Sequence, residues 1–453
     1  MNITVVGCGK IGSTILSSLV SEGHDVIAID NDPAVIEEIT NIYDIMGVCG
    51  NGVDCDTLSE ANIEKSDLFI AATGSDELNM LSCFVAGRMG AGHTIAKISN
   101  PEYNDQSLGF MQRELDLSLA VNPELLTAHE IYNVLKLPSA AKIETFSGRS
   151  FEMVELRLKH DSPLDGMSLI DLRKKYRASF LVCVVQRGES VYIPDGNFVL
   201  QNGDRIALTA SPSEIQKLMR MLGLMQKQAR DIMILGASKT AYYLSKILLS
   251  AGCSVKIVEL DREKCVQFSD KLRGASMING DGAKQELLLE EGLPQMDAFI
   301  TLTGSDEENI LLSFFASSMN VSKVISKVNR DEFASMAERL GLDCIVSPRK
   351  TVSDIIVRYA RALQNSEGSS NVETLYKLMD GKAEALEFSV REDFSLIDKP
   401  LREMSLKSGI LIAGIIRARK TIIPSGDDVI LAGDKVIVVA AGQRLDDLAD
   451  IIR

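Results

Sequence analysis

Short apolar runs alternate with longer amphipathic segments in the first part of the chain. The runs Ile3–Val6, Val26–Ile29 and Leu68–Ala72 each have the length of a buried strand, while Ser13–Val20 has the spacing of a helix. Strands that are apolar throughout and separated by helices are typical of a parallel sheet covered on both faces. The pattern therefore predicts a doubly wound α/β domain.

The residues after Pro123 follow a different pattern. A helix is expected over Glu124–Leu135, and short β-branched runs with tight turns then extend from Phe151 to Leu208. A further helical segment, Ser213–Leu222, closes this part of the chain. We therefore predict a small α+β domain after the parallel-sheet domain.

The whole arrangement occurs twice. Thr73–Asn79 returns 230 residues farther on as Thr303–Asn309 with six of seven residues identical, and Gly203-Asp204 returns as Gly433-Asp434. Because such landmarks keep their order, the chain is interpreted as one internal duplication. We place the join around residues 224–230 and a flexible linker over residues 365–371.

Composition excludes several classes of protein. The 63 acidic residues outnumber the 48 basic ones, so the chain would repel nucleic-acid phosphates, and we expect no nucleic-acid partner. No stretch approaches the roughly 18 consecutive apolar residues of a membrane span, so we expect a cytoplasmic protein. The eight cysteines form no C-x-x-C pair and there are four histidines, so we expect no metal site and interpret the thiols as reduced core residues.

A glycine-rich turn follows the first predicted strand. Gly7-Cys8-Gly9-Lys10-Ile11-Gly12 fits the G-x-G-x-x-G pattern, and Asp30 ends the next strand. In this context the glycines bring the backbone close to a pyrophosphate at a helix N-terminus, and the acidic residue binds ribose hydroxyls. The charges of Asp30 and Asp32 favour NAD over NADP, but ATP or ADP would satisfy the same groups.

The second copy carries an altered version of this motif. The turn reads Gly236-Ala237-Ser238-Lys239-Thr240-Ala241, with Glu259 after the next strand. A side chain at Ser238 obstructs close approach of a pyrophosphate to the backbone. We therefore expect a weaker or altered nucleotide site, with Glu259 still able to bind a ribose.

Other candidate contacts occur at the ends of later strands. The Ser75-Asp76 pair precedes a helix and is interpreted as its cap, and the glycine-rich turns around residues 51 and 281 are as consistent with a conformational role as with adenine binding. The remaining candidates are repeated residues at the edge where doubly wound sheets bind ligands. The full additional set is Asn51, Thr73, Gly74, Lys97, Asp281, Thr303, Gly304 and Lys327.

These motifs in duplicate, with repeated I-P-x-G turns, resemble the TrkA family of potassium-uptake regulators, which carry two RCK (KTN) modules. The resemblance implies RCK N-terminal nucleotide-binding domains at 1–123 and 230–348 and RCK C-terminal domains at 143–227 and 372–453. It further implies a homotetrameric regulatory subunit without catalytic residues, attached peripherally to the membrane through a TrkH-type potassium-translocating partner. Helices over 124–135 and 350–363 would transmit the effect of NAD(H) or ATP/ADP.

Two other interpretations remain open at this point. An NAD-dependent dehydrogenase would need an acid or base beside the nicotinamide, and only His129 lies in a plausible helix. A metabolite sensor acting on another cation transporter or an antiporter would carry the same motifs. Binding of NADH without turnover would favour a regulator over the enzyme.

Overall fold

The protein is described by a computed structural model in which the chain forms two compact units. Unit 1 consists of residues 1–132 and 229–360, and unit 2 of residues 133–228 and 361–453. Each unit therefore contains parts of both copies. The structure describes residues 1–103, 105–137, 139–146, 150–158, 162–176, 178–224, 228–366, 372–418 and 420–453.

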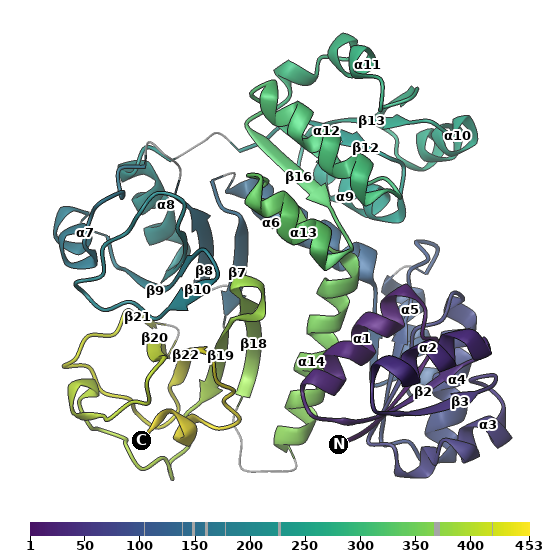
Figure 1. Ribbon diagram of the computed structural model, residues 1–453, viewed down its shortest axis with the longest axis horizontal. Coiled ribbons are helices and arrows are strands. Elements are labelled where there is room, and N and C mark those ends of the chain that lie inside the picture. The colour runs from purple at the N-terminus through teal and green to yellow at the C-terminus, as the bar shows by residue number, and fades with distance from the viewer. Residues whose placement is uncertain are drawn as a thin grey trace. The chain divides into compact units, whose positions relative to one another are not determined.

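Unit 1 contains two parallel sheets of the same topology. The first has the strand order β3-β2-β1-β4-β5-β6 and the second the order β14-β13-β12-β15-β16-β17. Figure 1 labels β2 and β3 of the first sheet and β12, β13 and β16 of the second. The strands of the first sheet are β1 (Asn2–Val6), β2 (Asp25–Asp30), β3 (Met46–Cys49), β4 (Leu68–Ala71), β5 (His93–Lys97) and β6 (Leu119–Val121). Its helices are α1 (Lys10–Ser21), α2 (Pro33–Ile42), α3 (Cys55–Glu60), α4 (Asp76–Met89), α5 (Asp105–Glu114) and α6 (Pro123–Lys136).

The second copy repeats these elements in the same sequence. Its strands are β12 (Asp231–Leu235), β13 (Ser254–Glu259), β14 (Ser276–Asn279), β15 (Ala298–Thr301), β16 (Lys323–Lys327) and β17 (Ile345–Val346). Its helices are α9 (Lys239–Ser250), α10 (Arg262–Lys271), α11 (Gln285–Glu290), α12 (Asp306–Ser318), α13 (Asp331–Arg339) and α14 (Pro348–Ser366). In both sheets the strand order reverses at the first strand, and such a switch point opens a crevice at the carboxyl ends of two neighbouring strands.

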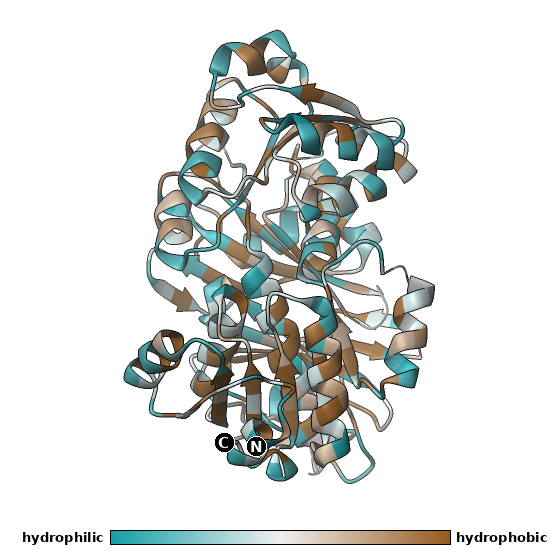
Figure 2. Ribbon diagram, turned by 90° about the vertical axis from the view of Figure 1, so that its right-hand side faces the viewer, coloured by the Kyte–Doolittle hydropathy of each residue, from teal (hydrophilic) through white to brown (hydrophobic). Residues whose placement is uncertain are grey.

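The core follows from the sequence pattern. All four residues of β4 are buried, and α1 buries Gly12, Ile15, Leu16 and Leu19, which lie on one face of a helix. In Figure 2 the strands are largely hydrophobic, whereas the helices alternate between hydrophobic and hydrophilic residues. Both faces of each parallel sheet are therefore covered by helices.

Unit 2 contains two antiparallel sheets. The first has the order β10-β9-β11-β8-β7, with β7 (Lys142–Phe146), β8 (Phe151–Arg157), β9 (Phe180–Arg187), β10 (Ser190–Tyr192), β11 (Arg205–Ala210) and helices α7 (Leu169–Lys175) and α8 (Pro212–Met221). The second has the order β18-β19-β22-β20-β21, with β18 (Val372–Leu378), β19 (Ala383–Ser389), β20 (Ile410–Arg417), β21 (Lys420–Ile422) and β22 (Lys435–Ala441).

The two antiparallel sheets share one hydrophobic core. Phe151 and Met153 of the first sheet belong to the same buried cluster as Ala413 and Ile437 of the second. A Cβ atom added at Gly414 would lie 2.5 Å from the Phe151 ring, so the sheets are in close contact. The two α+β domains therefore depend on each other for burial of their apolar faces.

The repeated Gly-Asp turn has a structural role in unit 2. Both oxygens of the buried Asp204 carboxylate accept hydrogen bonds from the Arg187 guanidinium at 2.8 Å, and Arg187 also donates to the carbonyl of Val199. Asp434 and Arg417 make the same bidentate contact in the second copy, at 2.8 and 2.7 Å. These contacts bind the Gly-Asp turn to β9 in the first copy and to β20 in the second.

The predicted fold class is confirmed, with two copies of a doubly wound sheet domain and a small α+β domain. Two details of the prediction are wrong. Helix α14 extends to Ser366, so the first two residues of the expected linker are helical, because a polar composition alone does not end a helix; residues 367–371 lie outside the described part. Cys49 and Cys55 are exposed rather than in the core. Among the described residues, no helix combines the length and apolarity needed to cross a membrane.

Candidate nucleotide site

A cavity opens at the switch point of the first sheet, at the carboxyl ends of β1 and β4. Its volume is about 310 Å³. The predicted residues that line it are Gly7, Gly9, Asp30, Asn51, Thr73 and Gly74. The lining residues that were not predicted are Val6, Asn31, Gly50, Gly52, Ala72, Ser75 and Leu78. Two of them offered a usable signal in the sequence, because Gly50 and Gly52 are repeated as Gly280 and Gly282.

Asp30 lies at the end of β2 with both carboxylate oxygens already oriented. One oxygen accepts the backbone N–H of Cys8 at 2.7 Å, and the other accepts the N–H of Asp32 at 3.0 Å. Each oxygen retains a further lone pair, so the carboxylate can also accept hydrogen bonds from two ribose hydroxyls. Cys8 itself is buried, and burial raises the pKa of its thiol to about 12. Cys8 therefore contributes its backbone rather than its side chain.

Two glycines of the turn are required by close packing. Gly7 has a φ of +83°, and a Cβ there would lie 2.6 Å from the nitrogen of Thr73. A Cβ at Gly12 would lie 1.8 Å from the carbonyl oxygen of Gly7, so Gly12 lets α1 approach the strand but does not line the cavity. The other predicted turn residues, Lys10 and Ile11, do not line it either.

Gly9 and Gly74 are not explained by packing. A Cβ at either position would meet no protein atom within 4 Å, and neither residue has a positive φ. Gly9 is also the N-cap of α1, whose first turn has no side-chain cap. Gly9 therefore brings the uncapped start of α1 to the edge of the cavity, and a helix N-terminus is suited to binding a phosphate.

Thr73 is fixed by Asn79, a residue that sequence reasoning did not single out. The fully buried Asn79 side chain accepts hydrogen bonds from the Thr73 nitrogen at 2.8 Å and hydroxyl at 2.7 Å, and donates to the carbonyl of Lys97 at 2.9 Å. Asn309 makes the same contacts with Thr303 and Lys327. The asparagine of the repeated segment thus ties the ends of two neighbouring strands together.

The interpretation of Ser75-Asp76 as a cap holds for one residue of the pair. Ser75 caps α4 by accepting the N–H of Leu78 at 3.2 Å. Asp76 lies inside α4, and its buried carboxylate accepts the N–H groups of Ser99 and Asn100 at 2.9 and 2.7 Å. The cap interpretation is wrong for Asp76 because its side chain turns toward the segment after β5 instead of its own helix.

Lys97 is half-buried at the end of β5, outside the residues that line the cavity. Burial lowers the pKa of its ammonium group, and the charges of Glu124 and Asp76 oppose that shift. Among the residues that the structure describes, its ammonium nitrogen has no hydrogen-bond partner. A desolvated cation without a partner is suited to binding an anion.

The second copy uses the corresponding groups internally. The Ser238 hydroxyl accepts the N–H of Ala241 at 3.3 Å and so caps α9, and the Lys327 ammonium donates to the carbonyl of Leu302 at 3.3 Å. Glu259 holds the N–H groups of Ala237 and Asp261 at 2.6 and 2.9 Å, as Asp30 does in the first copy. The backbone contacts of the acidic residue are thus the same in both copies, while the Ser238 hydroxyl and the Lys327 ammonium hold partners within the second copy.

Other predicted second-copy residues have identifiable positions. Gly236 has a φ of +95° and lies against Thr303, and a Cβ at Gly304 would meet no protein atom within 4 Å. Thr240 is buried. Asp281 accepts the N–H of Ala283 at 3.0 Å, as Asn51 accepts that of Val53 at 3.3 Å, so both residues stabilise their own turns.

Lys239 lies near groups of the first copy. The hydrogen bond from Tyr103 is the main cause of a Glu77 pKa near 2, and the charge of Lys239 contributes to the same lowering. Lys239 also contributes to the lowered pKa of Lys97. The ammonium group that was assigned to the second site therefore acts on the side chains around the first.

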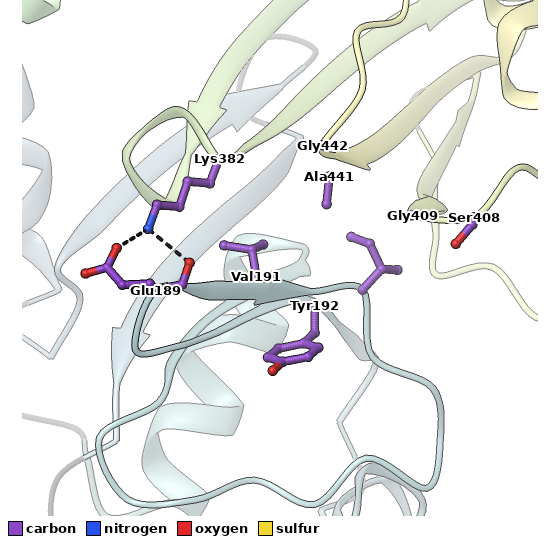
Figure 3. Close-up of a pocket in the computed structure, with 9 residues that line it drawn as sticks. Glu189, Val191, Tyr192, Lys382, Ser408, Gly409, Ala441 and Gly442 are labelled. Atoms are coloured by element: carbon purple, nitrogen blue, oxygen red, sulfur yellow. Dashed lines mark hydrogen bonds and ion pairs between the residues drawn. The ribbon is translucent and has the colours of Figure 1, made fainter.

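A larger cavity of about 420 Å³ lies in unit 2, between the β9–β10 hairpin and the end of β22. Figure 3 shows Lys382 at its edge, where the ammonium contacts the Glu189 carboxylate at 2.7 Å and its carbonyl at 3.1 Å. The cavity contains none of the predicted site residues. No group of three or more His, Cys, Asp or Glu side chains suited to a metal occurs in the described ranges.

Comparison with known proteins identifies both domains. The TrkA-N domain family matches residues 3–111 and 232–348, and the TrkA-C domain family matches residues 153–223 and 385–453. A Trk system potassium uptake protein TrkA homolog of Archaeoglobus fulgidus is 30% identical over 453 residues, which cover 100% of both chains. The Trk system potassium uptake protein TrkA of Vibrio alginolyticus is 27% identical over 452 residues, covering 98% of this chain and 96% of its own.

Solved structures support the same fold. The crystal structure of the GsuK RCK domain superimposes with a TM-score of 0.63 at 16% identity, covering 97% of this chain and 92% of that chain. The GsuK channel bound to NAD gives a TM-score of 0.62 at 16% identity, covering 97% and 77%. With both domains matched in duplicate and a full-length relative at 30% identity, the chain belongs to the TrkA family of potassium uptake proteins.

Proposed function

We propose that the chain is a cytoplasmic regulatory subunit that binds NAD(H) or ATP/ADP and gates a TrkH-type potassium-translocating membrane protein. The observation that carries the proposal is the cavity beside Asp30, where an uncapped helix N-terminus and the open positions Gly9 and Gly74 meet. These residues fit an adenosine diphosphate group, which all four nucleotides contain. Asp30 would bind the ribose, and the N-terminus of α1 would bind phosphates. Lys97 and Lys239 lie outside the cavity lining and would add positive charge beside it.

The two copies are proposed to contribute unequally. The second site keeps Glu259 for a ribose and retains Thr303 and Gly304 at its edge, but Ser238 and Lys327 hold internal partners. A diphosphate would have to displace those hydrogen bonds. We therefore assign the high-affinity site to the first copy and a weaker one to the second.

Regulation requires that the nucleotide binds more tightly to one of two conformations of the protein. A ligand with equal affinity for both arrangements shifts no equilibrium, so NAD against NADH, or ATP against ADP, must differ in the contacts they make. Helices α6 and α14 continue from unit 1 into unit 2, and we propose them as the elements that carry the change. The four-domain division at 1–123, 143–227, 230–348 and 372–453 is kept as part of the proposal.

Self-association is supported by exposed apolar side chains on equivalent helices of both copies. Leu81 of α4 is 50% exposed and Leu311 of α12 is 68% exposed, while Phe110 of α5 and Met336 of α13 are 58% and 49% exposed. Leu81 and Leu311 occupy matched positions, whereas the residue that corresponds to Phe110 is Ser335. Patches of large exposed apolar residues are typical of interfaces. Two equivalent faces per chain fit assembly of four chains into a closed ring of eight modules.

The dehydrogenase alternative has no support from the relatives named above, which are potassium uptake proteins and channel RCK domains. His129, the histidine considered for hydride transfer, does not line the nucleotide cavity. We do not retain this alternative.

Titration calorimetry with NAD, NADH, ADP and ATP tests the binding step. Asp30→Ala should abolish the high-affinity heat, whereas the matched Glu259→Ala variant should leave it in place. Potassium flux through vesicles that contain a TrkH-type partner tests the gating step. The proposal would be contradicted if none of the four nucleotides bound, or if none of them changed the potassium flux.

A further inference from the structure

Tyr243 of α9 connects the second copy to the first. Its hydroxyl accepts a hydrogen bond from the Asn122 side-chain amide at 2.9 Å and donates to the carbonyl of Ser99 at 3.4 Å. Burial raises the pKa of this hydroxyl to about 12, so it stays protonated and can donate throughout the physiological pH range. We refer to the contacts among Tyr243, Ser99 and Asn122 as the Tyr243 bridge.

One end of the bridge is attached to the wall of the nucleotide cavity. Ser99 belongs to the segment after β5, which the Asp76 carboxylate holds through the N–H groups of Ser99 and Asn100. Asp76 is the first residue of α4, directly after Ser75, which lines the cavity. A change at the start of α4 therefore reaches the Ser99 carbonyl through two short hydrogen bonds.

The other end of the bridge is attached to α6. The side-chain oxygen of Asn122 accepts the N–H of Leu125 at 2.9 Å, and the backbone carbonyl of Asn122 accepts the N–H of Leu126 at 3.0 Å. Asn122 thus caps α6 with one side of its amide and reaches Tyr243 with the other. The position of the first turn of α6 therefore depends on where Tyr243 holds the Asn122 amide.

Among the described residues, the second site has no counterpart of the bridge. The position equivalent to Tyr243 in the first copy is Thr14, whose hydroxyl donates to the carbonyl of Lys10 at 3.0 Å within its own helix. Ser347 occupies the position equivalent to Asn122. The bridge consequently serves the copy whose anion-binding groups are open.

We propose that Tyr243 is the positioning residue that couples the first nucleotide site to α6. The inference rests on the proposed function and adds a specific role for the second copy, whose α9 supplies the connection. When a nucleotide moves the start of α4, the Ser99 segment moves with it, and the bridge transfers the displacement to the Asn122 cap. Because coupling free energies are reciprocal, loss of the bridge must also change nucleotide affinity.

The test compares Tyr243→Phe with Tyr242→Phe in the full chain. Tyr242 is the adjacent tyrosine, and its ring contacts Tyr243 and Phe268 edge to face, so its phenylalanine variant controls for loss of a hydroxyl in the same helix. ADP is the probe, affinity is measured by calorimetry, and hydrogen exchange reports protection of residues 122–132. Asn122→Ser is a second variant, which introduces the residue of the second copy: the Ser347 hydroxyl accepts the N–H of Lys350 at 3.4 Å, so a serine keeps an acceptor for the helix cap but removes the amide donor.

We expect Tyr243→Phe to weaken ADP binding about 3- to 10-fold, because the bridge contributes to affinity by as much as it is stronger in the nucleotide-bound chain. It should also remove at least half of the ADP-induced change in α6 protection, and Asn122→Ser should do the same, while Tyr242→Phe behaves like the unmodified chain. Affinity within twofold of the unmodified chain, or an unchanged α6 response, would overturn the inference. If the unmodified chain itself binds no nucleotide, the proposed function fails instead, which is a distinguishable result.

Discussion

The difference between Gly9 and Ser238 gives the sharpest prediction about the two sites. Gly9→Ser would place in the first copy the hydroxyl that caps α9 in the second, where it accepts the N–H of Ala241 at 3.3 Å. The equivalent donor in α1 is the N–H of Gly12, and α1 has no side-chain cap. In the proposed complex this N–H faces the phosphates, so the substitution would give to the protein one backbone donor that the nucleotide would otherwise use.

The size of the effect follows from the interaction that is lost. A hydrogen bond to a charged group contributes about 1.5–3 kcal/mol, which corresponds to a loss of roughly 10- to 150-fold in affinity. Folding should change little, because a serine N-cap and a glycine N-cap differ by only a few tenths of a kcal/mol. No packing cost is expected, since a Cβ at Gly9 meets no protein atom within 4 Å.

Calorimetry with ADP and NAD, together with thermal unfolding, checks this prediction. Gly9→Ser should bind both ligands more weakly with an unchanged unfolding transition, and the reciprocal variant Ser238→Gly should leave the first site unaffected and strengthen binding at the second. Binding by Gly9→Ser within a factor of two of the unmodified chain would refute the reasoning, because the α1 N-terminus would then not contact the phosphates.

Three further predictions concern packing, charge and the repeated turn. Gly7→Ala should lower the free energy of unfolding by at least about 1–2 kcal/mol in denaturant titrations, because the φ of Gly7 is +83°. The matched variant Gly74→Ala should change that free energy by less than about 0.5 kcal/mol but weaken ADP binding. Because burial lowers the Lys97 pKa from 10.5, ADP affinity should fall as pH rises through that lowered value, and Lys97→Met should remove this dependence in calorimetry across pH. Asp204→Ala should cost about 2–3 kcal/mol in chemical unfolding, below the full value for a buried pair because the Arg187 side chain is 34% exposed; an unchanged midpoint would show that the pair does not stabilise unit 2.

The fold was predictable because its signals are local and repeated. The run Leu68–Ala72 is apolar throughout and became β4, and the glycine turn before α1 fixed the direction of the first strand and helix. Sharing of one core by Phe151 and Ala413 could not be predicted, because pairing of two sheet faces leaves no periodic signal in either strand. The end of α14 was also missed, since polar residues can continue a helix.

The candidate site was predictable where the chemistry depends on residue type. Asp30 and the glycine turn were found from spacing, but Asn79 was not, because a buried asparagine that binds two strand ends has no short-range sequence signature. The position of Lys239 near Glu77 depends on how the two copies pack within unit 1. The sequence therefore led to the assignment of Lys239 to the second site, and only the tertiary structure shows that it lies near residues of the first copy.

The shared core of unit 2 has a consequence for biosynthesis. A ribosome that adds about 5–20 residues per second would deliver the second antiparallel sheet on the order of 10 to 45 seconds after the first. During that interval the face that carries Phe151 and Met153 has no partner in its own chain. The nascent first half is therefore exposed to aggregation, and a chain that ended there would need a second identical chain to cover the same face.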